Sequence, residues 1–382
     1  MNPISLITGF FRFFSVYADP YEKRVDRFLK KVNQYSRRDL EKLVQEDLVK
    51  LTIFFEYKFR GYKKLKKRYR IKLYRNAVAI ATDFQKFFDQ RKTEIARGQK
   101  SMRLPDGLRN DEHMTYLLGI MNYLKPGKRL RYEESATFQK LLRNPVSEEL
   151  VGDCNQITTL YIYLYSLRYP VSDLQVKILP QHICLRYRGI DIETTNATLT
   201  EYPIYTFLSS VDEIVAANLL DIPDPSERQY EISPANMLKS AQVAYHFSSH
   251  RQTVERNLLI AYHNMAVYYA KQKDFSKATL FANKSGSTKL QQQITRMEAL
   301  DCLKAKRYEK ALEKFRRIKD GEGEKACYQN ELADLFEKTK AFKVVSDFRN
   351  HKSTLRRMEE LALKLNNQKV VDFVNDVLKK LS

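Results

Sequence analysis

The segment "VGDCNQITTLYIYLYSLRYP" (residues 151–170) predicts a helix that begins at a cysteine. Asp153 can cap this helix and Gln156 can complete a capping box, which places Cys154 in the first turn. Apolar side chains then recur at helical spacing along one stripe, namely Ile157, Leu160, Tyr161, Leu164 and Leu167. Cys154 precedes this stripe at its core-facing edge, where unpaired backbone N–H groups and the helix dipole favour a thiolate. Two interpretations follow: an attacking thiol, or an ordinary buried sulfur.

Downstream of this helix, three short segments are typical of strands. They are "DLQVKIL" (173–179), "HICLRYR" (182–188) and "IDIETT" (190–195). His182 begins the second segment, and Asp191 and Glu193 lie two apart on the third, so both acids face the same side. An antiparallel pair of strands can bring one of these carboxylates to the His182 imidazole, fix its tautomer and support the imidazolium.

The chain before this helix is expected to be helical and strongly basic. No proline occurs from Tyr21 to Gly98, and apolar residues recur at helical intervals, which predicts two or three long helices. Ser36 or Asp39 could begin one of them, and Gly98 is the expected stop. Residues 1–100 hold 25 Lys and Arg against 11 Asp and Glu, which suggests a polyanionic or membrane-surface partner.

The charge is densest in "KFRGYKKLKKRYRIKLYR" (58–75), where Tyr62, Leu65, Tyr69 and Leu73 form an apolar stripe. We favour a solvated helix whose apolar stripe packs on its neighbours and whose Lys and Arg stems cover it. The alternatives are an anionic membrane surface or another polyanion bound by residues 22–98 and, ranked last, nucleic acid, since no nucleic-acid motif accompanies the charge.

From about Ser233 the chain is predicted to be helical, and this part repeats. The aromatic positions Phe275, Tyr308 and Phe342 are 33 and 34 residues apart. A small residue lies nine positions before each aromatic, namely Ala266, Ala299 and Ala333. Three positions after each aromatic lie Ala278, Ala311 and Val345. This pattern resembles the tetratricopeptide repeat, a helix-turn-helix unit that implies a surface for a peptide or a partner protein.

The order of cysteine helix, histidine strand and acid strand resembles the transglutaminase-like, papain-like fold. Closer still is the similarity to bacterial proteins in which such a core precedes tetratricopeptide repeats: "GDC" opens the helix, "HICLR" begins at the histidine and "IETTNAT" carries the acid. The resemblance implies that Cys154 is the nucleophile and His182 the general base. It favours Glu193 as the orienting acid, with Asp191 as the alternative. Cys184 stands where transglutaminases usually have an aromatic residue.

These observations predict an α+β protein with three parts: a basic helical region (1–110), a small transglutaminase-like core with antiparallel strands (111–232) and an α-solenoid of tetratricopeptide-like repeats (233–382). The expected activity is cysteine-dependent acyl transfer, by a peptidase, amidase or transamidase, on a protein or peptide amide without a cofactor. The alternative is a non-catalytic scaffold that binds protein partners.

The four cysteines, Cys154, Cys184, Cys302 and Cys327, lie far apart and lack C-x-x-C spacing. This spacing argues against a disulfide framework or a zinc site and fits a reducing compartment. We therefore expect a cytoplasmic protein, with peripheral attachment to a membrane as one extension. Secretion is the alternative, since the apolar residues 1–18 also suit a signal peptide.

Overall fold

A computed structural model of the chain describes residues 15–60, 65–134, 136–220, 232–342 and 344–381. Contacts between residues divide the chain into two compact units, residues 1–258 and 259–382. Most of the apolar amino-terminal segment (1–14) and Tyr62 of the basic stretch lie outside the described residues. No helix of the described ranges is both long enough and apolar enough to span a membrane.

Three long helices occupy the start of the first unit, as predicted: α2 (Pro20–Lys30), α3 (Arg37–Phe55) and α4 (Lys67–Ser101). Ser36 caps α3 and forms a capping box with Asp39, which confirms the predicted start. The predicted stop at Gly98 is wrong, because α4 continues to Ser101. The buried Gln99 anchors this last turn by donating a hydrogen bond of 2.6 Å to the Leu108 carbonyl.

The basic stretch does not form one continuous amphipathic helix. After α3 the chain makes a π-type turn (Glu56–Arg60), and α4 begins only at Lys67. Leu65 and Leu73 are buried as predicted, but Arg70, expected on the cationic face, is fully buried as well. Its guanidinium pairs with the buried Glu22 at 2.7 Å and donates to the Leu65 carbonyl at 2.8 Å. A carboxylate and a carbonyl therefore satisfy this cation inside the protein.

The rest of the first unit combines shorter helices with strands. The helices are α5 (Glu112–Tyr123), α6 (Phe138–Leu141), α7 (Cys154–Ser166), α8 (Glu213–Leu220) and α9 (Pro234–Phe247), with short 3₁₀ turns at Val32–Gln34, Asp106–Leu108 and Val171–Asp173. The strands are β1 (Leu130–Tyr132), β2 (Leu150–Gly152), β3 (Leu174–Leu179), β4 (His182–Tyr187), β5 (Ile190–Glu193), β6 (Thr198–Thr200) and β7 (Phe207–Ser210).

The last five strands form one antiparallel sheet in the order β6-β5-β4-β3-β7, and β1 pairs with β2 in parallel. The predicted strands correspond to β3, β4 and β5. A sheet of this kind beside a majority of helices makes the chain an α+β protein, as expected.

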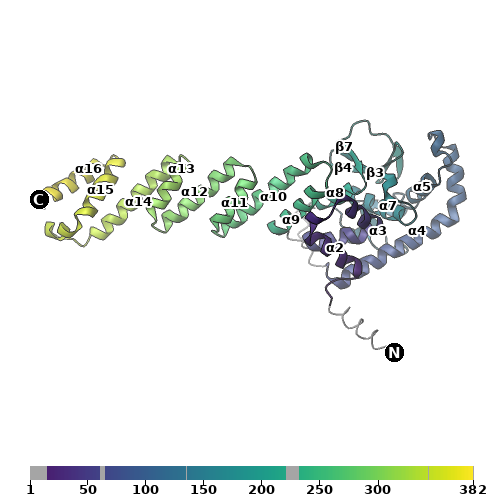
Figure 1. Ribbon diagram of the computed structural model, residues 1–382, viewed down its shortest axis with the longest axis horizontal. Coiled ribbons are helices and arrows are strands. Elements are labelled where there is room, and N and C mark those ends of the chain that lie inside the picture. The colour runs from purple at the N-terminus through teal and green to yellow at the C-terminus, as the bar shows by residue number, and fades with distance from the viewer. Residues whose placement is uncertain (1–14, 61–64, 135, 221–231, 343, 382) are drawn as a thin grey trace, which may run out of the picture. The chain divides into compact units, whose positions relative to one another are not determined.

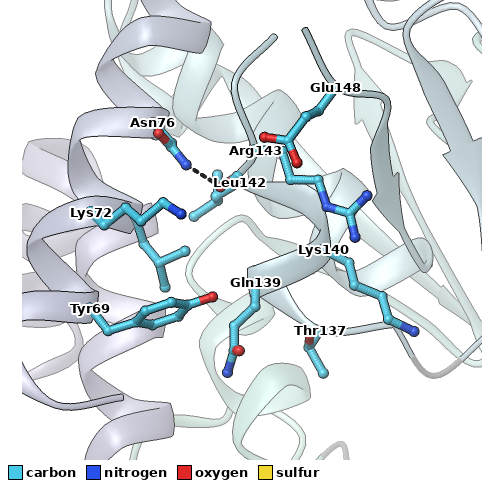
Figure 2. Close-up of a pocket in the computed structure, with 10 residues that line it drawn as sticks. Tyr69, Lys72, Asn76, Thr137, Gln139, Lys140, Leu142, Arg143 and Glu148 are labelled. Atoms are coloured by element: carbon cyan, nitrogen blue, oxygen red, sulfur yellow. Dashed lines mark hydrogen bonds between the residues drawn. The ribbon is translucent and has the colours of Figure 1, made fainter. Parts of the chain in front are cut away.

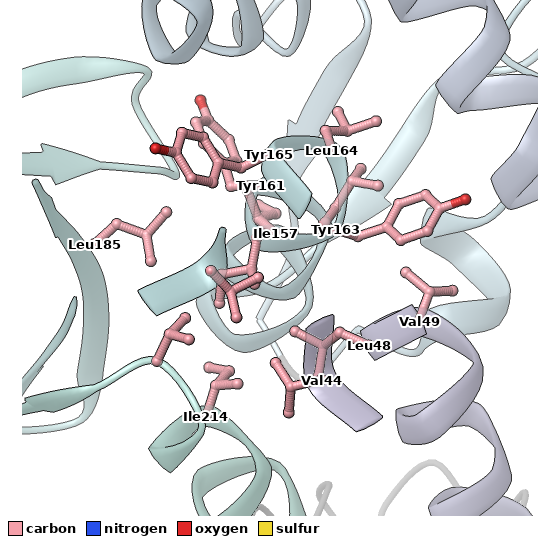
Figure 3. Packing of buried hydrophobic residues seen from close by; sticks show 14 of the residues in the cluster. Val44, Leu48, Val49, Ile157, Tyr161, Tyr163, Leu164, Tyr165, Leu185 and Ile214 are labelled. Carbon is pink, nitrogen blue, oxygen red and sulfur yellow. The ribbon is translucent and has the colours of Figure 1, made fainter. Parts of the chain in front are cut away.

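Helix α7 lies at the centre of the first unit and packs against β4 and α3 (Figure 1). Its predicted apolar stripe is buried except at Leu167, which is 47% exposed because it follows the last residue of the helix. Tyr161 and Tyr165 lie on one side of α7, and Tyr163 extends on the other side toward Val49 of α3 (Figure 3). Among the described residues of this unit, five tyrosines have fully buried side chains: Tyr116, Tyr123, Tyr161, Tyr165 and Tyr187.

The second unit is helical. The helices are α10 (Arg251–Lys271, which begins in the first unit), α11 (Phe275–Lys284), α12 (Thr288–Lys304), α13 (Tyr308–Arg317), α14 (Gly321–Thr339), α15 (Lys352–Lys364) and α16 (Gln368–Lys380), with a 3₁₀ segment at Val345–His351.

The first two predicted repeats have matching local geometry. Ala266, Ala299, Ala278 and Ala311 are fully buried. The turn residues Lys273 and Lys306 share a left-handed backbone, with φ of 61° and 58°. The third predicted repeat differs, because Ala333 is exposed and Val345 begins a 3₁₀ segment instead of lying within an α-helix.

Candidate active site

Cys154 is the first residue of α7, as the capping pattern predicts. The Asp153 carboxylate accepts hydrogen bonds from the backbone N–H groups of Asn155 (3.0 Å) and Gln156 (3.1 Å). The Gln156 side chain in turn accepts the Asp153 backbone N–H at 2.9 Å. This capping box is complete and mostly buried, so it fixes the position of the half-buried Cys154 at the amino-terminal end of the helix.

His182 is the first residue of β4 and contacts both other members of the predicted triad. The preceding residue, Gln181, has a φ of 58°, which makes the tight turn from β3 into β4. The His182 Nε2 atom lies 2.7 Å from Oε2 of Glu193, and the imidazole also forms a side-chain hydrogen bond with Cys154. Since Glu193 occupies Nε2, Nδ1 is the ring nitrogen left for the thiol.

Glu193 is the last residue of β5 and is almost fully buried. Besides His182, its carboxylate accepts hydrogen bonds from the Thr195 backbone N–H (2.9 Å), the Thr195 hydroxyl (2.5 Å) and the Tyr202 hydroxyl (2.7 Å). Burial raises the pKa of Glu193, but the hydrogen bonds from His182, Thr195 and Tyr202 outweigh burial and lower this pKa to about 2. Glu193 is therefore a carboxylate at neutral pH.

The protonation of His182 depends on the same contacts. The hydrogen bonds with Cys154 and then Glu193 raise the pKa of His182 to about 10, against the opposing effect of burial. The side chain keeps 27% of its surface exposed. The site therefore favours an imidazolium at neutral pH, held between Cys154 and the Glu193 carboxylate.

Asp191, the alternative acid, has other partners. Its carboxylate lies 2.5 Å from Nζ of Lys177 and 2.6 Å from Nη1 of Arg186, and it accepts the Tyr202 backbone N–H at 2.9 Å. Asp191 and Lys177 are both almost fully buried. The structure thus brings Cys154, His182 and Glu193 together and pairs Asp191 with two cations.

Several residues of the site were not predicted. Tyr202, in the loop after β6, binds Glu193 through its hydroxyl and Asp191 through its backbone, so it connects the two acids. The Thr158 hydroxyl of α7 lies 2.8 Å from that of Thr194, which joins the cysteine helix to the residue after Glu193. Thr194 and Thr195 belong to the quoted "IETTNAT", but the position of a threonine in the sequence does not predict which group its hydroxyl will contact.

Tyr132 of β1 lies at the exposed side of the site. It pairs in register with Gly152, two residues before Cys154, and is 48% exposed. Burial of part of the phenol and the nearby charges of Cys154 and Asp153 raise its pKa. A half-exposed aromatic ring beside the thiol is suited to contact a bound peptide.

Cys184 differs from Cys154 in its surroundings. It lies on β4, is fully buried, and burial raises the pKa of its thiol to about 12. A thiol of this kind stays protonated and unreactive. Cys302 and Cys327 are also buried. In the described part of the chain, no three His, Cys, Asp or Glu side chains gather in a way that could hold a metal ion.

Comparison with known protein families, with curated proteins and with solved structures finds no match to this chain. Functional inference therefore depends on the geometry of Cys154, His182 and Glu193.

Proposed function

We propose that this protein is a cysteine-dependent acyl-transfer enzyme that acts on a protein or peptide amide. The proposal depends on one observation: hydrogen bonds connect Cys154, His182 and Glu193. His182 is hydrogen-bonded to Cys154 at the start of a helix and to the buried carboxylate of Glu193. This is the nucleophile, base and orienting acid of a thiol triad. The same order of residues underlies the resemblance to transglutaminase-like cores.

In the proposed reaction, the Cys154 thiolate attacks the carbonyl carbon of the amide and forms a tetrahedral intermediate. The His182 imidazolium then protonates the nitrogen as the C–N bond breaks, which leaves a thioester on Cys154 and a neutral imidazole. Water or a second amine attacks the thioester and gives a proton to the neutral His182 as the C–S bond breaks, which restores the Cys154 thiolate and the imidazolium. Glu193 keeps Nε2 protonated and stabilises the imidazolium throughout. We favour hydrolysis over transamidation, because water needs no second binding site.

We further propose that the helical second unit binds the protein substrate or a partner. Its first two helix pairs have buried alanines and left-handed turns 33 residues apart, which supports the resemblance to tetratricopeptide repeats. Such repeats present an extended binding surface, and attachment of the basic helices to an anionic surface would hold the enzyme near its substrate.

A cysteine-directed probe with an amide-mimicking electrophile tests the enzymatic proposal. We expect Cys154 of the folded protein to react on the order of 10²-fold faster than free cysteine at neutral pH, and His182→Ala to abolish this advantage. Cys184→Ala is the matched control and should label at the wild-type rate. If Cys154 labels no faster than free cysteine and His182→Ala changes nothing, the result contradicts the enzyme and favours the scaffold.

A further inference from the structure

A cavity of about 240 Å³ lies between α4 and the segment from Thr137 to Glu148. It contains no member of the proposed triad. The lining residues are Tyr69, Lys72, Leu73, Asn76, Thr137, Gln139, Lys140, Leu142, Arg143 and Glu148. In Figure 2, Tyr69 and Lys72 extend from α4 toward Gln139 and Arg143 on the facing segment. The cavity therefore has polar walls contributed by two separate parts of the chain.

Three of the lining side chains are cations. Lys140 forms an ion pair with Glu133. Lys72 and Arg143 form no ion pair with an acidic side chain among the residues that the structure describes, and Glu148 is the single acid that lines the cavity. The lining thus has an excess of positive charge in a concave site, where low-dielectric walls strengthen attraction for an anion.

The two walls are held at a fixed separation. The Asn76 side-chain amide of α4 donates a hydrogen bond of 2.8 Å to the Leu142 carbonyl. Leu73 and Leu142 are buried next to this bond, and Thr137 is also buried. The backbone positions that carry Lys72 and Arg143 are therefore held at a set separation before a ligand arrives, which reduces part of the entropic cost of binding.

We propose that this cavity binds the phosphate groups of a small phosphate ester or of pyrophosphate. The Arg143 guanidinium can donate two parallel hydrogen bonds to phosphate oxygens, and Lys72 supplies a compact charge. Gln139, Thr137 and the Tyr69 hydroxyl offer further donors. The volume lies below the roughly 300 Å³ at which pockets for drug-sized ligands begin, so it suits one or two phosphate groups rather than a whole nucleotide.

Isothermal titration of the full-length protein with inorganic pyrophosphate at low ionic strength tests the site. We expect saturable binding by the wild type and at least tenfold weaker binding by the double variant Lys72→Gln/Arg143→Gln. The matched control is Lys86→Gln/Lys92→Gln, which removes the same charge from exposed positions of α4 outside the cavity. The control should bind within twofold of the wild type.

The site is contradicted if the wild type does not bind pyrophosphate, if the cavity variant binds as tightly as the wild type, or if the control loses affinity equally. Vesicles of phosphatidylcholine with and without phosphatidic acid then identify the source of the phosphate. Competition with pyrophosphate by the phosphatidic acid vesicles alone assigns the site to a lipid headgroup. Absence of competition assigns it to a free phosphate compound.

Discussion

At the scale of single residues, Asp191 and Glu193 show what spacing can and cannot predict. Both acids point to the same face of β5, so their spacing predicts a carboxylate near His182 without deciding which one, and only the family resemblance favours Glu193. Lys177 and Arg186 decide it, because they neutralise Asp191, while Glu193 reaches Nε2 of His182. Tyr202, which binds both acids, was unpredictable because its position depends on the path of the loop after β6.

Substituting each acid in turn should distinguish the residue that orients His182 from the residue that stabilises the fold. We expect Glu193→Gln to lower the Cys154 labelling rate by on the order of 10²-fold, because a neutral amide cannot support the imidazolium. Asp191→Asn leaves Lys177 and Arg186 without their anion, so it should lower the melting temperature while folded protein labels at nearly the wild-type rate. Equal losses of labelling in the two variants would contradict the assignment of Glu193.

The raised pKa of His182 predicts a pH-dependent contribution to stability. An unfolded histidine titrates near pH 6.5, whereas the folded pKa is about 10. The stabilisation is therefore fully present below about pH 6.5 and is lost as the pH rises toward 10. The difference in urea-unfolding free energy between wild type and His182→Ala should shrink over this range. The control is His263→Ala, which removes an exposed histidine. If the difference in unfolding free energy between wild type and His182→Ala stays constant with pH, the result contradicts the contacts of His182 with Cys154 and Glu193.

At the scale of elements, long periodic segments were predictable and short paired ones were not. The strands β3 and β4 have six residues each, and β5 alternates isoleucine with acidic residues, whereas β1, β2, β6 and β7 have only three or four residues each. In the basic stretch (58–75), too, local features were predictable and a contact with a distant residue was not. Its apolar spacing correctly predicted buried Leu65 and Leu73, but burial of Arg70 depends on Glu22, which lies 48 residues away.

Loss of the Arg70 guanidinium should strongly destabilise the first unit. Arg70→Ala leaves the buried carboxylate of Glu22 without its ion-pair partner, so we expect a loss of about 3–5 kcal/mol in the free energy of unfolding. Arg75→Ala removes an exposed cation from the same helix and should cost no more than about 0.5 kcal/mol. Urea denaturation measures the free energy of unfolding of both variants. Equal losses would show that the buried ion pair of Arg70 with Glu22 contributes no more to stability than an exposed cation does.

Two glycines of α14 offer a matched test of packing in the second unit. A Cβ atom at Gly323 would clash with the ring of Phe315, whose side chain is fully buried, whereas a Cβ atom at Gly321 meets nothing within 4 Å. We expect Gly323→Ala to cost about 1–3 kcal/mol through overpacking. Gly321→Ala should be neutral or slightly stabilising, since alanine favours helix. Thermal unfolding distinguishes the two variants. An unchanged melting temperature for Gly323→Ala would contradict the close approach of the Phe315 ring to Gly323.

At the scale of the whole molecule, the two units have separate hydrophobic cores. The largest cluster of buried apolar residues draws its members from Tyr21 to Phe247, and the others lie between Ala266 and Val377. Charge is unevenly distributed, because residues 1–100 hold 25 Lys and Arg against 11 Asp and Glu, while the whole chain has a net charge of +21.

Separate cores predict that destabilisation stays within one unit. Arg70→Ala should increase amide hydrogen exchange in residues 1–258, and Gly323→Ala should increase it in residues 259–382. Hydrogen-exchange mass spectrometry with peptides from both units measures this directly. Faster exchange across the entire chain in either variant would show that the two units unfold as one cooperative structure.

The buried tyrosines around α7 also give the protein an optical reporter. The chain has 24 tyrosines and no tryptophan, so tyrosine dominates its near-ultraviolet absorbance. Burial raises the pKa of the Tyr161 and Tyr165 phenols far above that of an exposed tyrosine. In an alkaline titration, the exposed phenols ionise first and the buried ones only when the core opens. The second rise in phenolate absorbance therefore follows the loss of packing around the helix that carries Cys154, without any label.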